Sequence, residues 1–279
     1  MQGESRASLA TAKDDLDALV ATMHGADGRT DTAAVTQLAD QLFAVQHVLD
    51  REISLRRAFT DPSSNAPARA GLARQLFGAQ LSERTLEVLT ALVSSSWAAP
   101  RDVVDAVGEL AVQALYSLAA SAGNLDNVED ELFRFGRIVD REPALLLALT
   151  DPSASTERRL ALVDSLLEGK ASETTRRLVH ELVVSPRGRT FGTNLDEYVR
   201  LAAESREQLV ARVRTAVPLT DAQAARLAEA LATQLGRPVH LNIELDPDVV
   251  GGLTIRIGDT VFDGSIARRL DEARRRFAS

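Results

Sequence analysis

One segment of this chain occurs twice, at an offset of 90 residues and without a gap. Residues 40–63 read DQLFAVQHVLDREISLRRAFTDPS, and residues 130–153 read DELFRFGRIVDREPALLLALTDPS. The identical pieces include Asp-Arg-Glu, at 50–52 and 140–142, and Thr-Asp-Pro-Ser, at 60–63 and 150–153. Chance does not produce this degree of identity. The fold must therefore contain one structural unit that is used twice.

Apolar residues fall at helical spacing in both copies, which predicts amphipathic helices with one buried face. These residues are Leu38, Leu42, Val45 and Leu49 in the first copy and Leu125, Val128, Leu132 and Phe135 in the second. The Asp-Pro pair in each copy predicts the end of a helix, because the residue before proline is disfavoured in the α conformation. Ser63 or Ser155 is then available to cap the next helix. We expect each copy to be an antiparallel bundle of short helices.

The domain organisation follows from the same offset. A helix expected to begin near Arg101 matches one expected to begin near Phe191, so it is a candidate to close the first bundle and open the second. We predict a first helical bundle over residues 1–122 and a second over residues 123–208, with helix 101–122 as the element that the two could share. A different domain is predicted over residues 209–279.

Beyond Gln208 the apolar period changes from helical to alternating, which predicts β-strands. Strands are expected at 210–217, at 239–245, and in a hairpin formed by 253–257 and 260–262. Pro218 should end the first strand, and the turn between the hairpin strands should be Gly258-Asp259.

Two helices are expected in the same region. A T-x-x-Q capping box from Thr220 to Gln223 predicts a helix that stops at Gly236, and Ser265 is expected to cap a last helix. The predicted fold is therefore mainly α with a small α+β domain. A duplicated antiparallel helical bundle is followed by a mixed domain in the order strand, helix, strand, hairpin, helix.

The residues that most enzyme chemistry requires are missing or scattered. The sequence has no cysteine, which excludes disulfides, thiolate nucleophiles and cysteine-ligated metals. It has no G-x-x-x-x-G-K-[ST] phosphate loop, and the adjacent Gly251 and Gly252 lie between two predicted strands, where a turn needs their backbone freedom. The histidines occur singly, without metal-site spacing; they are His24, His47, His180 and His240. We predict no catalytic residue, no bound metal and no cofactor.

The balance of charge limits the partners. The chain carries 32 basic and 40 acidic residues, a formal net charge of −8, which disfavours binding to nucleic acid. The longest uncharged stretches, residues 88–100 and 110–125, are too short to span a membrane. The amino terminus is charged throughout and has no signal-peptide core. We therefore expect a cytoplasmic chain without a membrane span of its own.

Three runs of charged residues are expected to be solvated. Glu129-Asp130-Glu131 follows a helix start, where negative charge complements the helix dipole. Arg187-Gly188-Arg189 is predicted to be a loop, and Arg274-Arg275-Arg276 a helix end. Either basic run could contact an acidic partner surface, although the solvated interpretation is favoured.

The final segment, from Val213 to Ser279, resembles the carboxyl-terminal signature of the delta subunit of F-type ATP synthases, called the oligomycin-sensitivity-conferring protein in mitochondria. The helical part resembles the amino-terminal bundle of the same family, but in duplicate, as in the long forms of high-GC actinobacteria. The signature residues, structural or partner-facing, are Asp246, Pro247, Gly251, Gly252, Gly258, Asp259, Asp263, Gly264, Ser265 and Leu270.

The resemblance implies a non-catalytic stator subunit. In the family, the helical bundle holds the amino-terminal segments of alpha subunits of the catalytic head, and the carboxyl-terminal domain grips the b subunits of the peripheral stalk, so that proton-driven rotation is coupled to ATP synthesis. It also implies a hetero-oligomeric complex at the cytoplasmic face of the bacterial cell membrane, to which this subunit is peripheral. The extra copy leaves open which bundle holds an alpha segment. The alternative function is a free-standing helical adaptor or regulatory protein-binding module.

Overall fold

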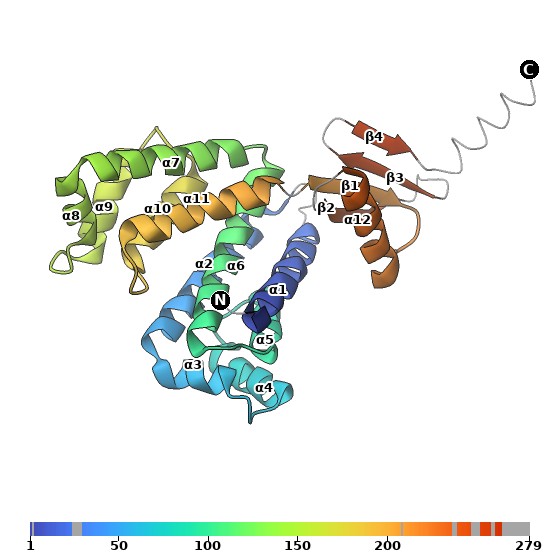
Figure 1. Ribbon diagram of the computed structural model, residues 1–279, viewed down its shortest axis with the longest axis horizontal. Helices are drawn as coiled ribbons and strands as arrows, with labels where there is room; N and C mark the ends of the chain where they lie inside the picture. The colour runs from blue at the N-terminus through green and yellow to red at the C-terminus, as the bar shows by residue number, and fades with distance from the viewer. Residues whose placement is uncertain are drawn as a thin grey trace, which may run out of the picture. The chain divides into compact units, whose positions relative to one another are not determined.

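Helices form the first part of the chain, and a small mixed sheet with one helix forms the described part of the second (Figure 1). The computed structural model describes residues 1, 3–23, 30–207, 209–235, 239–246, 252–257 and 260–263. They fall into two compact units, Met1–Ser205 and Arg206–Ser279. The predicted fold, mainly α with a small α+β part, is confirmed.

The helical unit contains the two repeats in order. The first consists of α1 (Gly3–Ala21), α2 (Thr32–Arg51), α3 (Ile53–Thr60), α4 (Ala66–Phe77), α5 (Glu83–Ser94) and α6 (Pro100–Ser121). The second consists of α7 (Leu125–Arg141), α8 (Pro143–Thr150), α9 (Thr156–Leu167), α10 (Glu173–Val184) and α11 (Phe191–Glu207). Helices α3, α4 and α5 begin and end 90 residues before α8, α9 and α10. The sequence repeat is therefore a repeat of helices.

Each repeat buries the apolar stripe that its sequence predicts. All of the predicted stripe residues, Leu38, Leu42, Val45 and Leu49 on α2 and Leu125, Val128, Leu132 and Phe135 on α7, are buried. Helices α3 and α8 end immediately before Asp61 and Asp151, as the Asp-Pro pairs predict.

The cap of the following helix differs from the prediction in the first repeat. Ser155 caps α9 by accepting the N–H of Arg158 at 3.3 Å. Ser63 does not cap α4, because its N–H and its hydroxyl both donate to Asp61 Oδ1, at 2.9 and 2.7 Å. Asn65, which lies 90 residues before Ser155, caps α4 instead and accepts the N–H of Ala68 at 2.9 Å.

A side chain from a neighbouring helix reinforces the cap of α5 and of α10. Gln41 Oε1 accepts the N–H of Ser82, the N-cap of α5, at 3.0 Å. Glu131, at the equivalent place in the second repeat, accepts the N–H and the hydroxyl of Ser172, the N-cap of α10, at 2.9 and 2.8 Å. The expectation of a solvated Glu129-Asp130-Glu131 run is therefore wrong for Glu131, whose carboxylate ties α7 to the positive end of the α10 dipole.

Helix α6 is buried on nearly every side. Fourteen of its 22 residues are buried, and the helix contacts α1, α2, α3 and α5 of the first repeat and α7 and α10 of the second. One hydrophobic core runs through both repeats. In the part of the chain that the structure describes, α6 is also the one helix long and apolar enough to cross a membrane. Because its apolar side chains face this core, it is a core helix. The division into two bundles at residue 122 stays a prediction.

A glycine allows α2 and α6 to approach closely. A Cβ atom at Gly108 would lie 1.9 Å from Nε2 of Gln46, which is fully buried and donates to the carbonyl oxygen of Val104 at 3.3 Å. In the second repeat Gly136 occupies the position of Gln46, and a Cβ atom there would lie 2.8 Å from Cδ2 of Leu195 on α11. Close packing of the helix pair therefore depends on one small residue in each repeat.

The α+β unit is built on a four-stranded sheet. Its described elements are β1 (Leu209–Thr215), α12 (Asp221–Leu235), β2 (Val239–Leu245), β3 (Leu253–Ile257) and β4 (Thr260–Asp263). The strand order is β2-β1-β3-β4; β1 and β2 are parallel, and the other pairs are antiparallel. Helix α12 packs against β2, and a small core forms around Val213, Leu231, Val239 and Ile255.

The local predictions for this unit are largely confirmed. The capping box forms, with the Thr220 N–H donating to Gln223 Oε1 at 2.9 Å and the Gln223 N–H donating to Thr220 Oγ1 at 3.3 Å. The first strand is shorter than predicted and ends at Thr215, because the Thr215 hydroxyl donates to the carbonyl oxygen of Val217 at 3.0 Å and turns the chain out of the sheet. Gly236, the Gly258-Asp259 turn, the helix after Ser265 and Arg274-Arg275-Arg276 lie outside the described residues.

The contact between Gln46 and Gly108 leads to a double-mutant prediction. Gly108→Ala should destabilise the protein by about 1–3 kcal/mol, because the methyl group overpacks the α2 and α6 contact. In a Gln46→Ala background the same change should cost much less, because the clashing amide is gone. Chemical denaturation of the four proteins measures this coupling.

Gly71→Ala is the matched control, since Gly71 also lies in a helix, α4, but nothing stands within 4 Å of an added Cβ atom. It should leave the stability unchanged or raise it by up to about 1 kcal/mol. An equal cost of Gly108→Ala in both backgrounds would contradict the packing argument.

Candidate partner-binding surfaces

Three of the signature residues lie at one end of the sheet. Asp246 directly follows β2, Gly252 directly precedes β3, and Asp263 ends β4. The register brings these ends together, because Thr215 of β1 pairs with Leu245 of β2 and Leu253 of β3, and Asp263 pairs with Thr254. The other signature residues, Pro247, Gly251, Gly258, Asp259, Gly264, Ser265 and Leu270, lie outside the described residues.

Hydrogen bonds hold this end of the sheet together. The Arg214 guanidinium donates to Asp246 Oδ2, and the N–H of Asp246 donates to the carbonyl oxygen of Thr215 at 2.9 Å. The Thr215 hydroxyl also lies 3.5 Å from the carbonyl oxygen of Gly252. Gly252 has φ +78°, a left-handed conformation that suits glycine, so the backbone freedom expected at this position is used. The arrangement shapes a surface and contains no nucleophile.

Two large apolar side chains are exposed at the same end of the sheet. Val217 is 65% exposed and Leu245 is 60% exposed. The alternation along residues 239–245 predicts that Leu245 shares a face with Val239, which is buried, and Val217 falls inside a predicted strand. The sequence therefore does not indicate that these two side chains are exposed. Both side chains leave apolar surface in water at the end of the sheet where Asp246 and Gly252 lie. We call Val217, Leu245 and the ends of β1 and β2 the sheet-end surface.

A network of polar contacts joins the two repeats around Asp105. The Arg189 guanidinium donates to Asp105 Oδ2 at 2.9 Å, and Arg187 lies 4.0 Å from Oδ1. Arg187 stacks over the Tyr198 ring, 5.9 Å from its centroid, and its side chain is only 4% exposed. Arg187-Gly188-Arg189 is a loop, as predicted, and Gly188 and Arg189 are exposed; the expectation of solvation is wrong for Arg187, whose guanidinium is buried beside a carboxylate of the first repeat.

Two further side chains of this network donate hydrogen bonds to backbone carbonyl oxygens of the second repeat. Arg101 donates to Asp50 Oδ1 at 2.5 Å and to the carbonyl oxygen of Arg187 at 2.7 Å. The buried Tyr116 hydroxyl donates to the carbonyl oxygen of Tyr198 at 2.7 Å. Arg187 has φ +53°, a conformation that costs a non-glycine residue about 1–2 kcal/mol, and these contacts hold it there.

Helix α10 is tied to α2 by an ion pair and by a hydrogen bond between a histidine and a carboxyl group. Arg177 donates to both carboxylate oxygens of Asp40, at 2.8 and 2.9 Å. His47 Nε2 lies 2.7 Å from Glu181 Oε1. Burial raises the pKa of the Glu181 carboxyl, while the hydrogen bond from His47 and the charge of Arg187 lower it in part. We call this contact of α2 with α10 the repeat seam.

The described histidines each meet a carboxylate. Besides the pairing of His47, His180 Nε2 lies 2.8 Å from Asp164 Oδ1. His24 and the side chain of His240 lie outside the described residues. Within the described ranges, no group of three or more histidine, cysteine, aspartate or glutamate residues is suited to hold a metal ion.

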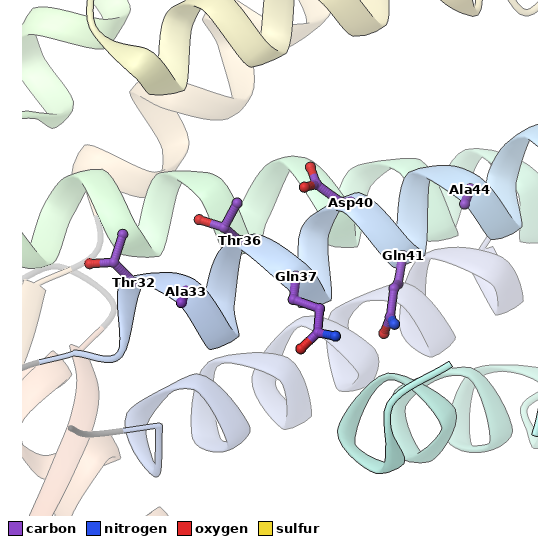
Figure 2. A pocket seen from close by; sticks show the side chains of 7 residues that line it. All are labelled: Thr32, Ala33, Thr36, Gln37, Asp40, Gln41 and Ala44. Atoms are coloured by element: carbon purple, nitrogen blue, oxygen red, sulfur yellow. The ribbon is translucent and has the colours of Figure 1, made fainter. Parts of the chain in front are cut away.

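A surface hollow of about 650 Å³ runs along α2. Figure 2 shows its lining, with Thr36 and Asp40 on one side of the helix and Gln37 and Gln41 on the other; Thr32, Ala33 and Ala44 complete it. The polar groups at its centre are already engaged, because Asp40 binds Arg177 and Gln41 binds Ser82. The hollow therefore offers little for small-molecule recognition.

Comparison with known proteins gives a consistent result along the chain. Residues 112–277 match the sequence model of the ATP synthase delta (OSCP) subunit family. The chain is 52% identical to the ATP synthase subunit delta of Streptomyces avermitilis over 279 residues, covering 99% of this chain and 98% of that protein. It is 45% identical to the ATP synthase subunit delta of Thermobifida fusca over 278 residues, covering all of both chains.

Among solved structures, a chain of the Toxoplasma gondii mitochondrial ATP synthase hexamer matches with 20% identity and a TM-score of 0.28, over 60% of this chain and 95% of that chain. A score this low supports no comparison of the folds. The family model begins within α6 and covers the second repeat and the α+β unit, whereas the relatives match the first repeat as well.

The carboxyl groups of Glu181 and Glu197 lead to opposite pH predictions. Because the pKa of Glu181 is raised, the folded protein binds the proton of this carboxyl group more tightly than the unfolded chain does. The contribution of Glu181 to the free energy of unfolding therefore falls as the pH rises above about 4.5. The hydrogen bond from Arg200 lowers the pKa of Glu197, so its contribution is lost as the pH falls.

As the pH rises above about 4.5, the Tm of Glu181→Gln should therefore rise relative to that of the unsubstituted protein. As the pH falls below about 4.5, the Tm of Glu197→Gln should rise relative to that of the unsubstituted protein, because the latter loses the Glu197 contribution. Thermal melts followed by circular dichroism measure both trends. If the difference in Tm between Glu181→Gln and the unsubstituted protein did not change with pH, burial of the Glu181 carboxylate would carry no cost, which would contradict the prediction.

Proposed function

The chain belongs to the ATP synthase delta (OSCP) subunit family, and from this premise we propose that it is a non-catalytic stator subunit, which links the catalytic head of the synthase to the peripheral stalk. The observation that carries this proposal is the similarity to ATP synthase delta subunits over the full length of the chain. A stator keeps the head from turning with the rotor, so that proton-driven rotation is coupled to ATP synthesis.

The helical unit is the part that binds the head. Its partners are the amino-terminal segments of alpha subunits, which dock as helices against helices. The duplication enlarges this unit, and the contacts among α2, α6, α10 and the loop after α10 join its two repeats. Such contacts suit a part that transmits torque, because a load on one repeat passes to the other through ion pairs and a common core.

The α+β unit binds the stalk, and its partners are the b subunits. The sheet-end surface supports this assignment, because it combines two exposed apolar side chains with a backbone held in place by Asp246, Thr215 and Gly252. A rigid apolar surface loses little conformational entropy when a partner covers it.

The location follows from the partners. As a peripheral subunit of a hetero-oligomeric complex, the chain reaches the cytoplasmic face of the bacterial cell membrane through the synthase. The apolar helix α6 has no part in this attachment, because its side chains fill the core of the helical unit.

Removal of the α+β unit provides the first test. A synthase reassembled with a chain that lacks residues 206–279 should keep the ATPase activity of its heads but lose ATP-driven proton pumping, since the head is no longer held by the stalk. Pumping by inverted vesicles is the measurement, and reassembly with the full chain is the control. Normal pumping by the shortened chain would overturn the stator proposal.

Substitution of the sheet-end surface provides a sharper test. Val217→Ser with Leu245→Ser should weaken co-sedimentation with purified stalk subunits by about tenfold, because two large apolar side chains are lost from the interface. Binding to isolated heads should not change. Leu76→Ser, at another exposed leucine in α4, is the matched control. Unchanged binding of the double variant to the stalk would exclude this surface as the stalk site.

A further inference from the structure

Two equivalent phenylalanines have different surroundings in the two repeats. Phe43 of α2 is 6% exposed, whereas Phe133 of α7, its counterpart 90 residues later, is 54% exposed. Figure 1 shows α7 at the outer edge of the helical unit. The same side chain is thus a core residue in one repeat and a surface residue in the other.

The position of Phe43 explains its burial. It lies one helical turn from Gln46, which faces α6, and from Asp40 and His47, which face α10. Two helices therefore flank the face of α2 that carries Phe43. One of them, α10, belongs to the other repeat and approaches with a glutamate, Glu181, on His47.

The corresponding face of α7 has no such second helix among the described residues. Helix α11 takes the place of α6, with Phe191 packed at 6.3 Å from Phe135 and with Leu195 next to Gly136. No described helix takes the place of α10. In a repeat array the last unit leaves open the face that its neighbour would cover, and such a face must be capped by something else.

The chemistry of this open face differs from that of a solvated helix. Its exposed apolar and basic residues at helical spacing are Phe133, Arg134, Arg137, Ile138 and Arg141, and Ile138 is 52% exposed; the exposed Asp130 lies on the same face. Arg134 pairs with Asp130, while Arg137 has no carboxylate partner in the described part of the chain. Two apolar side chains that flank arginines match an amphipathic helix with carboxylates beside its apolar stripe. We call this set of five residues the α7 face.

Helix α8, which follows α7 and contacts it, exposes further apolar side chains. Leu146 and Leu147 are 37% and 68% exposed, and the equivalent residues of the first repeat are Arg56 and Arg57. Where the first repeat has charged groups, the second thus exposes leucines to solvent. Such exposure is unfavourable for a free surface and favourable for one that a partner covers.

We propose that the α7 face is a docking site for an amphipathic, acidic helix of another subunit of the synthase, which lies along α7 as α10 lies along α2. The helix places a carboxylate on Arg137, as Glu181 is placed on His47, and covers Phe133 with apolar side chains. A second copy of this chain does not fit this role with its own α10, whose Arg177 and Glu181 are engaged by α2. The proposal rests on the stator function, because it takes the partner from the synthase.

Photo-crosslinking within the assembled synthase tests the proposal. The full chain carries p-benzoylphenylalanine in place of Phe133, and a matched chain carries it in place of Leu76, which is exposed to a similar degree on α4. After irradiation, the Phe133 position should be linked to a helical segment of another subunit, with an aspartate or glutamate within one turn of the linked residue. The Leu76 position should give no such product. Linkage of position 133 only within the chain, or to a second copy of it, would overturn the proposal.

Charge reversal is the second measurement. Arg137→Glu should weaken binding of the full chain to the remainder of the synthase by about tenfold, because it places like charges opposite each other. Arg84→Glu, at an exposed arginine of α5, should not change the binding. Both substitutions lie on the surface, so unchanged circular dichroism spectra are expected and confirm that the variants fold.

The outcomes separate this inference from the stator function. If the unsubstituted chain binds the synthase and Arg137→Glu binds equally well, the docking site is wrong and the stator function stands. If the unsubstituted chain does not bind, the stator function is wrong, and the docking site falls with it. Weaker binding of Arg137→Glu, together with a cross-link from position 133 to an acidic helix, supports both.

Discussion

The burial of α6 from both repeats is the constraint on which the helical unit depends. Helix α6 contacts four helices of the first repeat and two of the second, so both repeats constrain its side chains. Its side chains are therefore small or branched where helices come close, and Gly108 allows Gln46 of α2 to lie against the helix backbone. The apolar composition that would also suit a membrane span is a consequence of this position in the core.

The polar contacts between the repeats complement this common core. Apolar burial favours association but leaves orientation weakly specified, whereas an ion pair or a charge-assisted hydrogen bond requires one geometry. Asp105 with Arg187 and Arg189, Asp40 with Arg177, and His47 with Glu181 fix the second repeat against the first. For a subunit that holds a molecular machine against torque, a fixed orientation matters more than a small gain in stability.

Two outward surfaces are the ones that we propose to bind partners. The sheet-end surface and the α7 face have the same physical character, large apolar side chains exposed on a backbone that internal hydrogen bonds or helix geometry already hold. They lie on different units, one in the helices and one beside the sheet. A linker protein needs at least two such surfaces, because its work is to bind two parts of an assembly at once.

The sequence by itself determined the elements of this protein. Helix ends at Asp61 and Asp151, the capping box at Thr220 and the strands of the small sheet all follow from local rules, since the groups that act on one another are only a few residues apart.

Tertiary structure alone decided which side chains make contacts between helices that are distant in the sequence. Glu131 and Arg187 resemble solvated charges in the sequence, yet one caps α10 and the other neutralises Asp105. Phe43 and Phe133 are the same residue in the same repeat, and their different burial depends on α10, which belongs to a distant part of the chain. Burial is a property of neighbours, and neighbours that are distant in the sequence leave no local pattern.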